Sequence, residues 1–179
     1  APRYARRFIF LEIGARAENW PTLETEIRPF AAEKFPDFFK VSKACKVKVL
    51  LAERTFWEKA FVLFRETCTP LNHEKIERLS RHYYDLAMIG RNEAAERAIQ
   101  DGKLLSAVCE FDQIFFRRSG VDYENAKRGT FRLIPSMEKQ NELKKDYDKM
   151  SKEMFYGQQS DFNEIITELK ALEHRINKV

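Results

Sequence analysis

Apolar side chains recur at helical spacing along most of the chain after position 52. Between positions 53 and 67, Phe56, Ala60 and Leu63 fall on one stripe of a helical wheel. This spacing predicts an amphipathic helix that buries one face. The same argument predicts helices over 73–89, from 92 or 93, and over 103–117, 137–154 and 161–177, with Asn72 and Ser160 as two of the N-caps. Such a chain must fold largely by packing helices against one another.

Strand-like sequence lies before the first of these helices. Residues 8–13 are β-branched and aromatic and predict a buried strand, and residues 46–51 alternate and predict a second strand beside it. A short strand over residues 25–28 would be a third. Because two or three strands do not form a stable sheet without cover, we expect the cover to come from the helices or from strands preceding residue 1.

The predicted fold class is therefore α+β and predominantly helical. A small β-sheet of two or three strands is expected within residues 1–52, and a helical domain follows over 53–134. Residues 135–179 hold two helices joined by a short polar segment, which predicts a C-terminal helical hairpin that supports the domain or binds a partner.

Composition excludes several classes of protein. The 179 residues are 44% apolar and 34% charged, which is typical of a charge-rich globular protein. A net charge of +4 with interspersed signs argues against a dedicated DNA-binding protein but permits a local basic cleft. Cys45, Cys68 and Cys109 form no metal or disulfide pattern, so reduced thiols in a cytoplasmic protein are expected. No apolar run reaches the ~20 residues of a membrane span.

Two charged residues stand at unusual positions. Glu12 interrupts an otherwise apolar strand, where a carboxylate is costly unless a cation meets it. It could instead end the strand or pair with Arg16 or Lys48. Lys59 lies at the border of its helix's apolar stripe, from which its ammonium can reach a cleft. A solvated lysine paired with a nearby acid is the alternative.

The next helix carries a polar face of Arg78, Arg81 and Asp85, opposite its apolar side. Arg81 and Asp85 could be an ordinary exposed i, i+4 ion pair. Together with Glu12 and Lys59, they also supply residue types that metal-dependent nucleotidyl transfer needs, because carboxylates hold Mg²⁺ and cations offset phosphate charge. A single carboxylate is too few for a two-metal site.

Two motifs carry a family resemblance: Arg54-Thr-Phe-Trp-Glu-Lys-Ala60 and Arg78-Leu-Ser-Arg-His-Tyr-Tyr-Asp-Leu86. They resemble nucleotidyltransferase toxins of the AbiEii/AbiGii type, from abortive-infection and type IV toxin-antitoxin systems of bacteria. Less specific similarity extends over nearly the whole chain, through Phe10-Leu-Glu-Ile-Gly-Ala-Arg16, Phe131-Arg-Leu-Ile-Pro135, Asp146-Tyr-Asp-Lys-Met150 and Phe155-Tyr-Gly157.

The resemblance implies a nucleotidyltransferase core of the DNA polymerase β type, of which residues 1–52 would be the last part of the sheet. It implies catalytic roles for Glu12, Lys59 and Asp85, with Glu12 also a metal ligand. Nucleotide contacts would come from Arg54, Lys59, Arg81 and His82. Position 82 is an aspartate in many relatives, which leaves its role here open. The implied cofactors and partners are Mg²⁺, a nucleoside triphosphate, an RNA acceptor such as tRNA or a protein acceptor, and a cognate antitoxin.

One departure shapes the expectation of activity. Relatives carry a Gly-Ser or Gly-Thr loop and metal-binding acids upstream, whereas eleven residues precede Glu12 here. We therefore expect a C-terminal portion that alone neither binds Mg²⁺ tightly nor transfers nucleotides. The alternative is a non-catalytic helical interaction module. The two hypotheses differ on geometry, since the enzyme requires Glu12, Lys59 and Asp85 to converge on one cleft.

Overall fold

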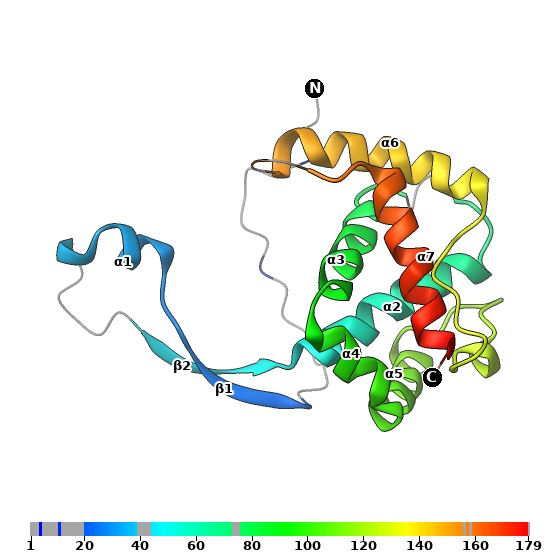
Figure 1. The fold of residues 1–179 in the computed structure, drawn as a ribbon, viewed down its shortest axis with the longest axis horizontal. Coiled ribbons are helices and arrows are strands. Elements are labelled where there is room, and N and C mark those ends of the chain that lie inside the picture. Colours follow the sequence, from blue (N-terminus) through cyan, green and yellow to red (C-terminus); the bar gives the residue numbers. More distant parts are fainter. Residues whose placement is uncertain are drawn as a thin grey trace.

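The computed structural model describes residues 4, 11, 20–38, 44–72, 76–155, 157 and 159–178. Figure 1 shows a helical body from which a β-hairpin arm projects. The predicted class, α+β with mostly helical content, is confirmed. The elements in order are β1 (Thr22–Ile27), α1 (Phe30–Lys34), a 3₁₀ turn (Pro36–Phe38), β2 (Cys45–Leu50), α2 (Ala52–Cys68), α3 (Ser80–Gly90), α4 (Glu93–Gln100), α5 (Gly102–Phe115), a 3₁₀ turn (Tyr123–Asn125), α6 (Met137–Met154) and α7 (Phe162–Lys178).

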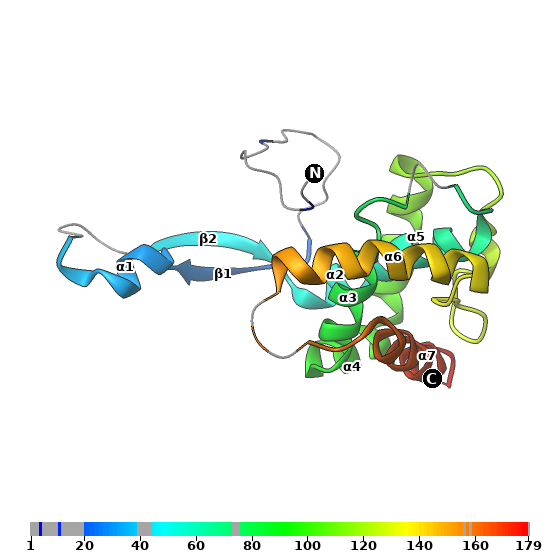
Figure 2. The same cartoon turned by 90° about the horizontal axis from the view of Figure 1, so that it is seen from above.

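The arm is an antiparallel pair of strands with α1 in the connection at its far end (Figures 1 and 2). Glu24 stands opposite Lys48 and Glu26 opposite Lys46, so opposite charges face each other across the two strands. The third strand predicted over 25–28 is present as β1, which begins earlier, and the strand predicted over 46–51 is present as β2. The strand predicted over 8–13 lies outside the described residues.

Helix α2 is the centre of the body. It follows β2 directly, and the base of the arm is tied to it because the Leu51 N–H donates to the Pro21 carbonyl over 3.0 Å. Helices α3, α4 and α5 all pack on it. Its predicted apolar stripe is confirmed, and the Trp57 Nε1–H donates to the Ala98 carbonyl of α4 over 3.0 Å. The core around α2 contains an aromatic cluster of buried side chains: Phe56, Trp57, Phe61, Phe64 and Phe131.

Helix α3 begins later than the periodicity predicts. The prediction of a helix over 73–89 capped by Asn72 is wrong at its start, because α3 begins at Ser80. Arg78 has a φ of 65°, a left-handed conformation that interrupts a helix. The N–H groups of Arg78 and Ser80 donate to the Asp146 carboxylate of α6 over 2.8 and 3.0 Å. A carboxylate from another helix therefore takes the place of a local N-cap side chain.

The two C-terminal helices have nearly the predicted bounds. Helix α7 is capped by Asp161, whose Oδ1 accepts the N–H groups of Asn163 and Glu164 over 2.7 and 2.9 Å. Glu164 returns a bond to the Asp161 N–H over 2.9 Å, which makes a reciprocal capping box. The prediction of Ser160 as the cap is wrong, since Asp161 supplies the cap and the Ser160 hydroxyl accepts the Arg91 guanidinium over 3.1 Å.

These helices are part of the body. Helix α7 lies along α3, and α6 crosses the end of α3 (Figures 1 and 2). The apolar residues that face inward are buried: Leu143, Tyr147 and Met150 on α6, and Phe162, Ile165, Leu169, Leu172 and Ile176 on α7. The segment over 135–179 therefore completes the core, and its two helices contact α3 more than they contact each other.

Buried charges join α2 to α5 and α6. Arg65 is paired with Asp112 of α5, which also accepts the Tyr123 hydroxyl over 3.0 Å. Burial lowers the pKa of Arg65 to about 10. Lys139 of α6 lies 3.0 Å from the Glu66 carboxylate. Each of these four charged residues is at most 7% exposed and each is paired, as buried charges must be.

Candidate functional site

Lys59 of α2 meets His82 and Asp85 of α3 at the surface where these two helices pack. The Lys59 ammonium donates to Asp85 Oδ2 over 2.8 Å and contacts His82 Nδ1 at 3.1 Å. The Lys59 side chain is 25% exposed and that of Asp85 is 41% exposed, so solvent reaches the pair. Of the three residues expected to converge, the structure thus brings two together. Glu12 lies outside the described residues.

His82 is uncharged at neutral pH. Burial, and then the positive charges of Lys59 and Arg81, lower its pKa to about 4, and the carboxylate of Asp85 opposes them only in part. A neutral imidazole that accepts a hydrogen bond at Nδ1 carries its proton on Nε2. His82 therefore serves as an acceptor for the Lys59 ammonium without adding charge of its own.

The Lys59 ammonium has more N–H donors than it has acceptors among the described residues. A lysine ammonium has three N–H groups. Two of them are directed at His82 and Asp85, and within the described part of the chain no further acceptor contacts it. The third N–H is therefore available on a partly exposed ammonium. The contacts with His82 and Asp85 set the orientation of that ammonium. This arrangement suits the binding of a phosphate or carboxylate oxygen.

Arg81 lies exposed on the turn that carries His82. Sequence reasoning left open an ion pair between Arg81 and Asp85. The structure instead pairs Asp85 with Lys59, a residue of another helix. A single helical wheel cannot reveal this partner, because it places only residues of one helix. Arg81 adds positive charge beside the site, as its effect on the pKa of His82 shows.

Arg54, a predicted nucleotide contact, is engaged within the protein. Its side chain is 0% exposed. Its guanidinium donates to the Trp20 carbonyl over 2.6 Å and to Glu58 Oε1 over 2.8 Å, and it lies over the Phe111 ring. These contacts tie the base of the arm to α2 and give Arg54 a structural role. Its predicted contact with a nucleotide remains a prediction.

Among the residues that the structure describes, no group of three His, Cys, Asp or Glu side chains could hold a metal ion. The Asp85 carboxylate, the acid that the described residues place in contact with Lys59, faces its ammonium. The described residues of the site therefore present a cation suited to an anionic ligand, and they include no metal-binding group of this kind.

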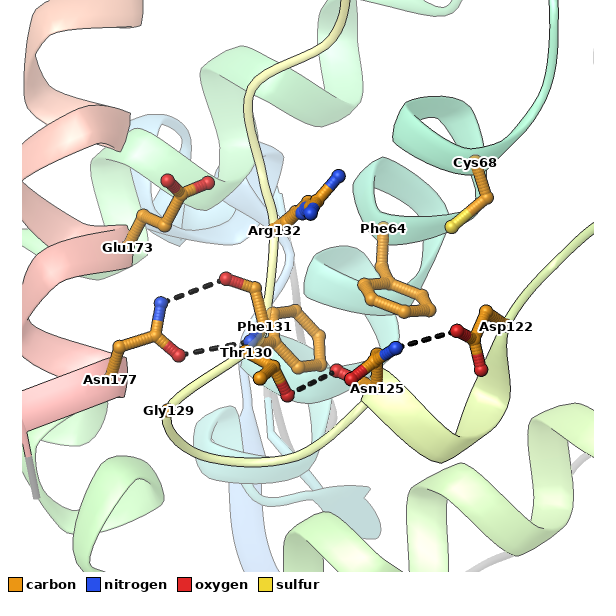
Figure 3. A pocket seen from close by; sticks show the side chains of 10 residues that line it. All are labelled: Phe64, Cys68, Asp122, Asn125, Gly129, Thr130, Phe131, Arg132, Glu173 and Asn177. Atoms are coloured by element: carbon orange, nitrogen blue, oxygen red, sulfur yellow. Dashed lines mark hydrogen bonds between the residues drawn. The ribbon is translucent and has the colours of Figure 1, made fainter.

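A separate cavity of about 380 Å³ opens between α2, α7 and the loop after α5 (Figure 3). Asn177 closes one side by bonding both the N–H and the carbonyl of Phe131, over 2.9 and 2.8 Å. Sequence reasoning missed this cavity, because residues far apart in the chain line it and no motif links them. The lining consists of Phe64, Cys68, Asp122, Asn125, Gly129, Thr130, Phe131, Arg132, Glu173 and Asn177.

The fold and the Lys59 site define an α+β helical protein with a directed cation suited to an anionic ligand. Comparison with protein families gives a more specific result: the family described as nucleotidyl transferase AbiEii toxin, type IV TA system, matches residues 2–168. This match covers most of the chain, which therefore belongs to that family. Neither a curated protein nor a solved structure matches the chain. None of the described helices is both long and apolar enough to cross a membrane.

Proposed function

We propose that this chain is the C-terminal part of a nucleotidyltransferase, in which Lys59 binds phosphate oxygens of a nucleoside triphosphate. One observation carries the proposal: the Lys59 ammonium is held by His82 and Asp85 and retains one N–H on a partly exposed surface. Membership of the AbiEii nucleotidyl transferase family supports the choice of a phosphate ligand over other anions.

The residues of the site would divide the work. Lys59 offsets negative charge that grows on the phosphate oxygens as an acceptor oxygen bonds to phosphorus and pyrophosphate leaves. Asp85 and His82 hold the ammonium in one direction, so little reorganisation is needed during the reaction. Arg81 increases the positive potential that attracts the triphosphate. Mg²⁺, which the reaction class requires, would neutralise further phosphate charge and would need ligands beyond the described residues, with Glu12 as the candidate.

The test is a transfer assay with labelled nucleoside triphosphates and Mg²⁺ on the full chain encoded by the gene. Lys59→Ala should lower the rate by roughly 10²-fold or more, the scale of losing one preorganised donor to developing charge. Asp85→Ala should lower the rate as well, because it releases the ammonium. Lys145→Ala is the matched control, since Lys145 forms a comparable pair with Glu142 on the exposed side of α6. Full activity in both Lys59→Ala and Asp85→Ala would refute the proposal.

The same assay addresses the acceptor and the extent of the active protein. We propose an RNA or protein acceptor, and label recovered in tRNA or in a protein band would distinguish them. The 179-residue chain, run in parallel, is expected to show no turnover, and turnover would refute that expectation. A cognate antitoxin, the partner that a type IV system implies, would be sought as an inhibitor in this assay.

The alternative of a non-catalytic interaction module has less support. In that alternative, the helices over 135–179 bind a protein partner and the aromatic motifs belong to the core. The inward-facing residues of α6 and α7 are buried in the core, so that face is already occupied.

A further inference from the structure

The Asp146 carboxylate, at the middle of α6, is bound entirely to the start of α3. It accepts the backbone N–H of Arg78 at Oδ1 over 2.8 Å and that of Ser80 at Oδ2 over 3.0 Å. The Ser80 hydroxyl donates to Oδ2 over 2.5 Å. Asp146 is 5% exposed and Ser80 is 0% exposed, so water does not compete for these bonds. Three charge-assisted hydrogen bonds converge on one helix end.

The helix end held in this way carries part of the candidate site. His82 lies in the first turn of α3, and its N–H donates to the Leu79 carbonyl over 3.0 Å. Asp85 lies in the following turn. Helix ends fray unless their free N–H groups find acceptors, so the first turn depends on its cap more than the second does. Loss of the Asp146 cap should therefore displace His82 more than Asp85.

The backbone before the helix needs the same support. Arg78 adopts a left-handed conformation that a non-glycine residue takes up at some cost. Its N–H is bound to Asp146, and its guanidinium donates to the Tyr4 carbonyl over 2.5 Å. Without the carboxylate, the first turn of α3 would lose its cap and the backbone before it would lose an anchor.

We propose that Asp146 is a positioning residue for the Lys59 site, which holds the first turn of α3 so that His82 stays against the Lys59 ammonium. The proposal rests on the proposed function only for the identity of the ligand, because the positioning itself can be measured without one. Its direct consequence is that weakening the Asp146 cap changes the surroundings of His82.

The experiment is an NMR titration of the His82 imidazole in the 179-residue chain, assigned with His82→Gln. The charged groups that act on His82 are Lys59 and Arg65 of α2 and Arg81 and Asp85 of α3. In Asp146→Asn, the amide places an NH₂ group where the carboxylate accepted. We expect the pKa of His82 to rise from about 4 toward its ordinary 6.5, as the ring moves toward water and away from Lys59. Ser80→Ala removes only the hydroxyl bond and should give a smaller rise.

Glu173→Gln is the matched control. Glu173 of α7 also accepts two backbone N–H groups, those of Leu133 and Ile134, and it lies outside the site. Both Asp146→Asn and Glu173→Gln should lower the melting temperature, but only Asp146→Asn should move the His82 titration. An unchanged His82 pKa in Asp146→Asn, or an equal rise in Glu173→Gln, would overturn the proposal. If Asp146→Asn does not fold, an unchanged His82 pKa in Ser80→Ala overturns it.

Failure of this proposal can be told apart from failure of the proposed function. If Lys59→Ala retains full transfer activity while Asp146→Asn raises the His82 pKa, the positioning role stands and the phosphate role of Lys59 falls. If the His82 titration does not move while Lys59→Ala is inactive, the phosphate role stands and Asp146 only stabilises the fold.

Discussion

Lys139 and Lys59 each form an ion pair that joins α2 to another helix, and they differ in exposure and in the number of acceptors they contact. Lys139 of α6 is 1% exposed and reaches the C-terminal end of α2. Its ammonium donates to Glu66 Oε2 over 3.0 Å and to the carbonyls of Glu66 and Thr69 over 2.7 and 2.9 Å. Lys59, nearer the start of α2, is 25% exposed and has two acceptors on α3.

The number of acceptors around each ammonium distinguishes a structural lysine from one that can bind a ligand. Lys139 has no donor left for a ligand, since its three N–H groups serve a carboxylate and the carbonyls that a helix end leaves without partners. Its position at the C-terminal end of α2 also suits the helix dipole. The orientation of the Lys59 ammonium is fixed by two acceptors, but its third N–H has no acceptor among the described residues. We infer that Lys139 secures the fold and that Lys59 is available for chemistry, and three predictions test this division.

The largest expected effect is on stability at the buried lysine. Lys139→Met keeps the length of the side chain but leaves the Glu66 and Thr69 carbonyls without their donor. Removing one partner of a buried ion pair costs about 3–5 kcal/mol. We expect a loss of this size in the free energy of unfolding, measured by urea denaturation. Lys145→Met, an exposed change on the same helix, should stay within about 0.5 kcal/mol. A loss below 1 kcal/mol for Lys139→Met would show that Lys139 does not secure the fold.

A smaller loss of stability is expected at low pH, where the Glu66 carboxylate is protonated. Burial by itself raises the pKa of Glu66, but hydrogen bonds from Lys139 and Arg118 outweigh it, and the net result is a pKa below the ordinary 4.5. A carboxyl with a lowered pKa in the folded state stabilises above pH 4.5 and loses that contribution as the pH falls through the lower value. Urea midpoints between pH 7 and pH 3 should therefore decline less steeply in Glu66→Gln than in wild type. Arg118→Met, which removes one of the two donors, should lie between them.

The sequence predicted what local periodicity determines. The bounds of α2 and α6 and the inward side of α3 follow from apolar spacing, because a stripe on one helix has only one way to be buried. The start of α3 does not follow. Its cap, Asp146, stands far along the chain on another helix, and nothing near Ser80 in the sequence points to it. A wheel also could not foresee the left-handed backbone at Arg78.

The candidate site was predicted in part for the same reason. Each helical wheel identified Lys59 or Asp85 separately, and only the family resemblance implied that the two meet; the structure shows their ion pair. The buried charges Glu66, Asp112 and Lys139 were missed, because a sequence does not distinguish a charged residue on a solvated face from one paired inside. Arg54 shows the converse, since a residue of the most specific motif is buried and bound to the protein itself.

The smallest expected change in stability belongs to Lys59. Because the Lys59–Asp85 pair is exposed to solvent, Lys59→Met should change the free energy of unfolding by less than about 1 kcal/mol, well below the effect of Lys139→Met. The electrostatic effect should nevertheless be clear in the His82 titration. The Lys59 charge is one cause of the low pKa of His82, second to burial, so its removal should raise that pKa from about 4. Lys145→Met removes a charge that is not among the causes of the low pKa of His82, so it serves again as the control in urea denaturation and NMR titration. A destabilisation by Lys59→Met as large as that by Lys139→Met would mean that both lysines secure the fold, and the division between them would fail.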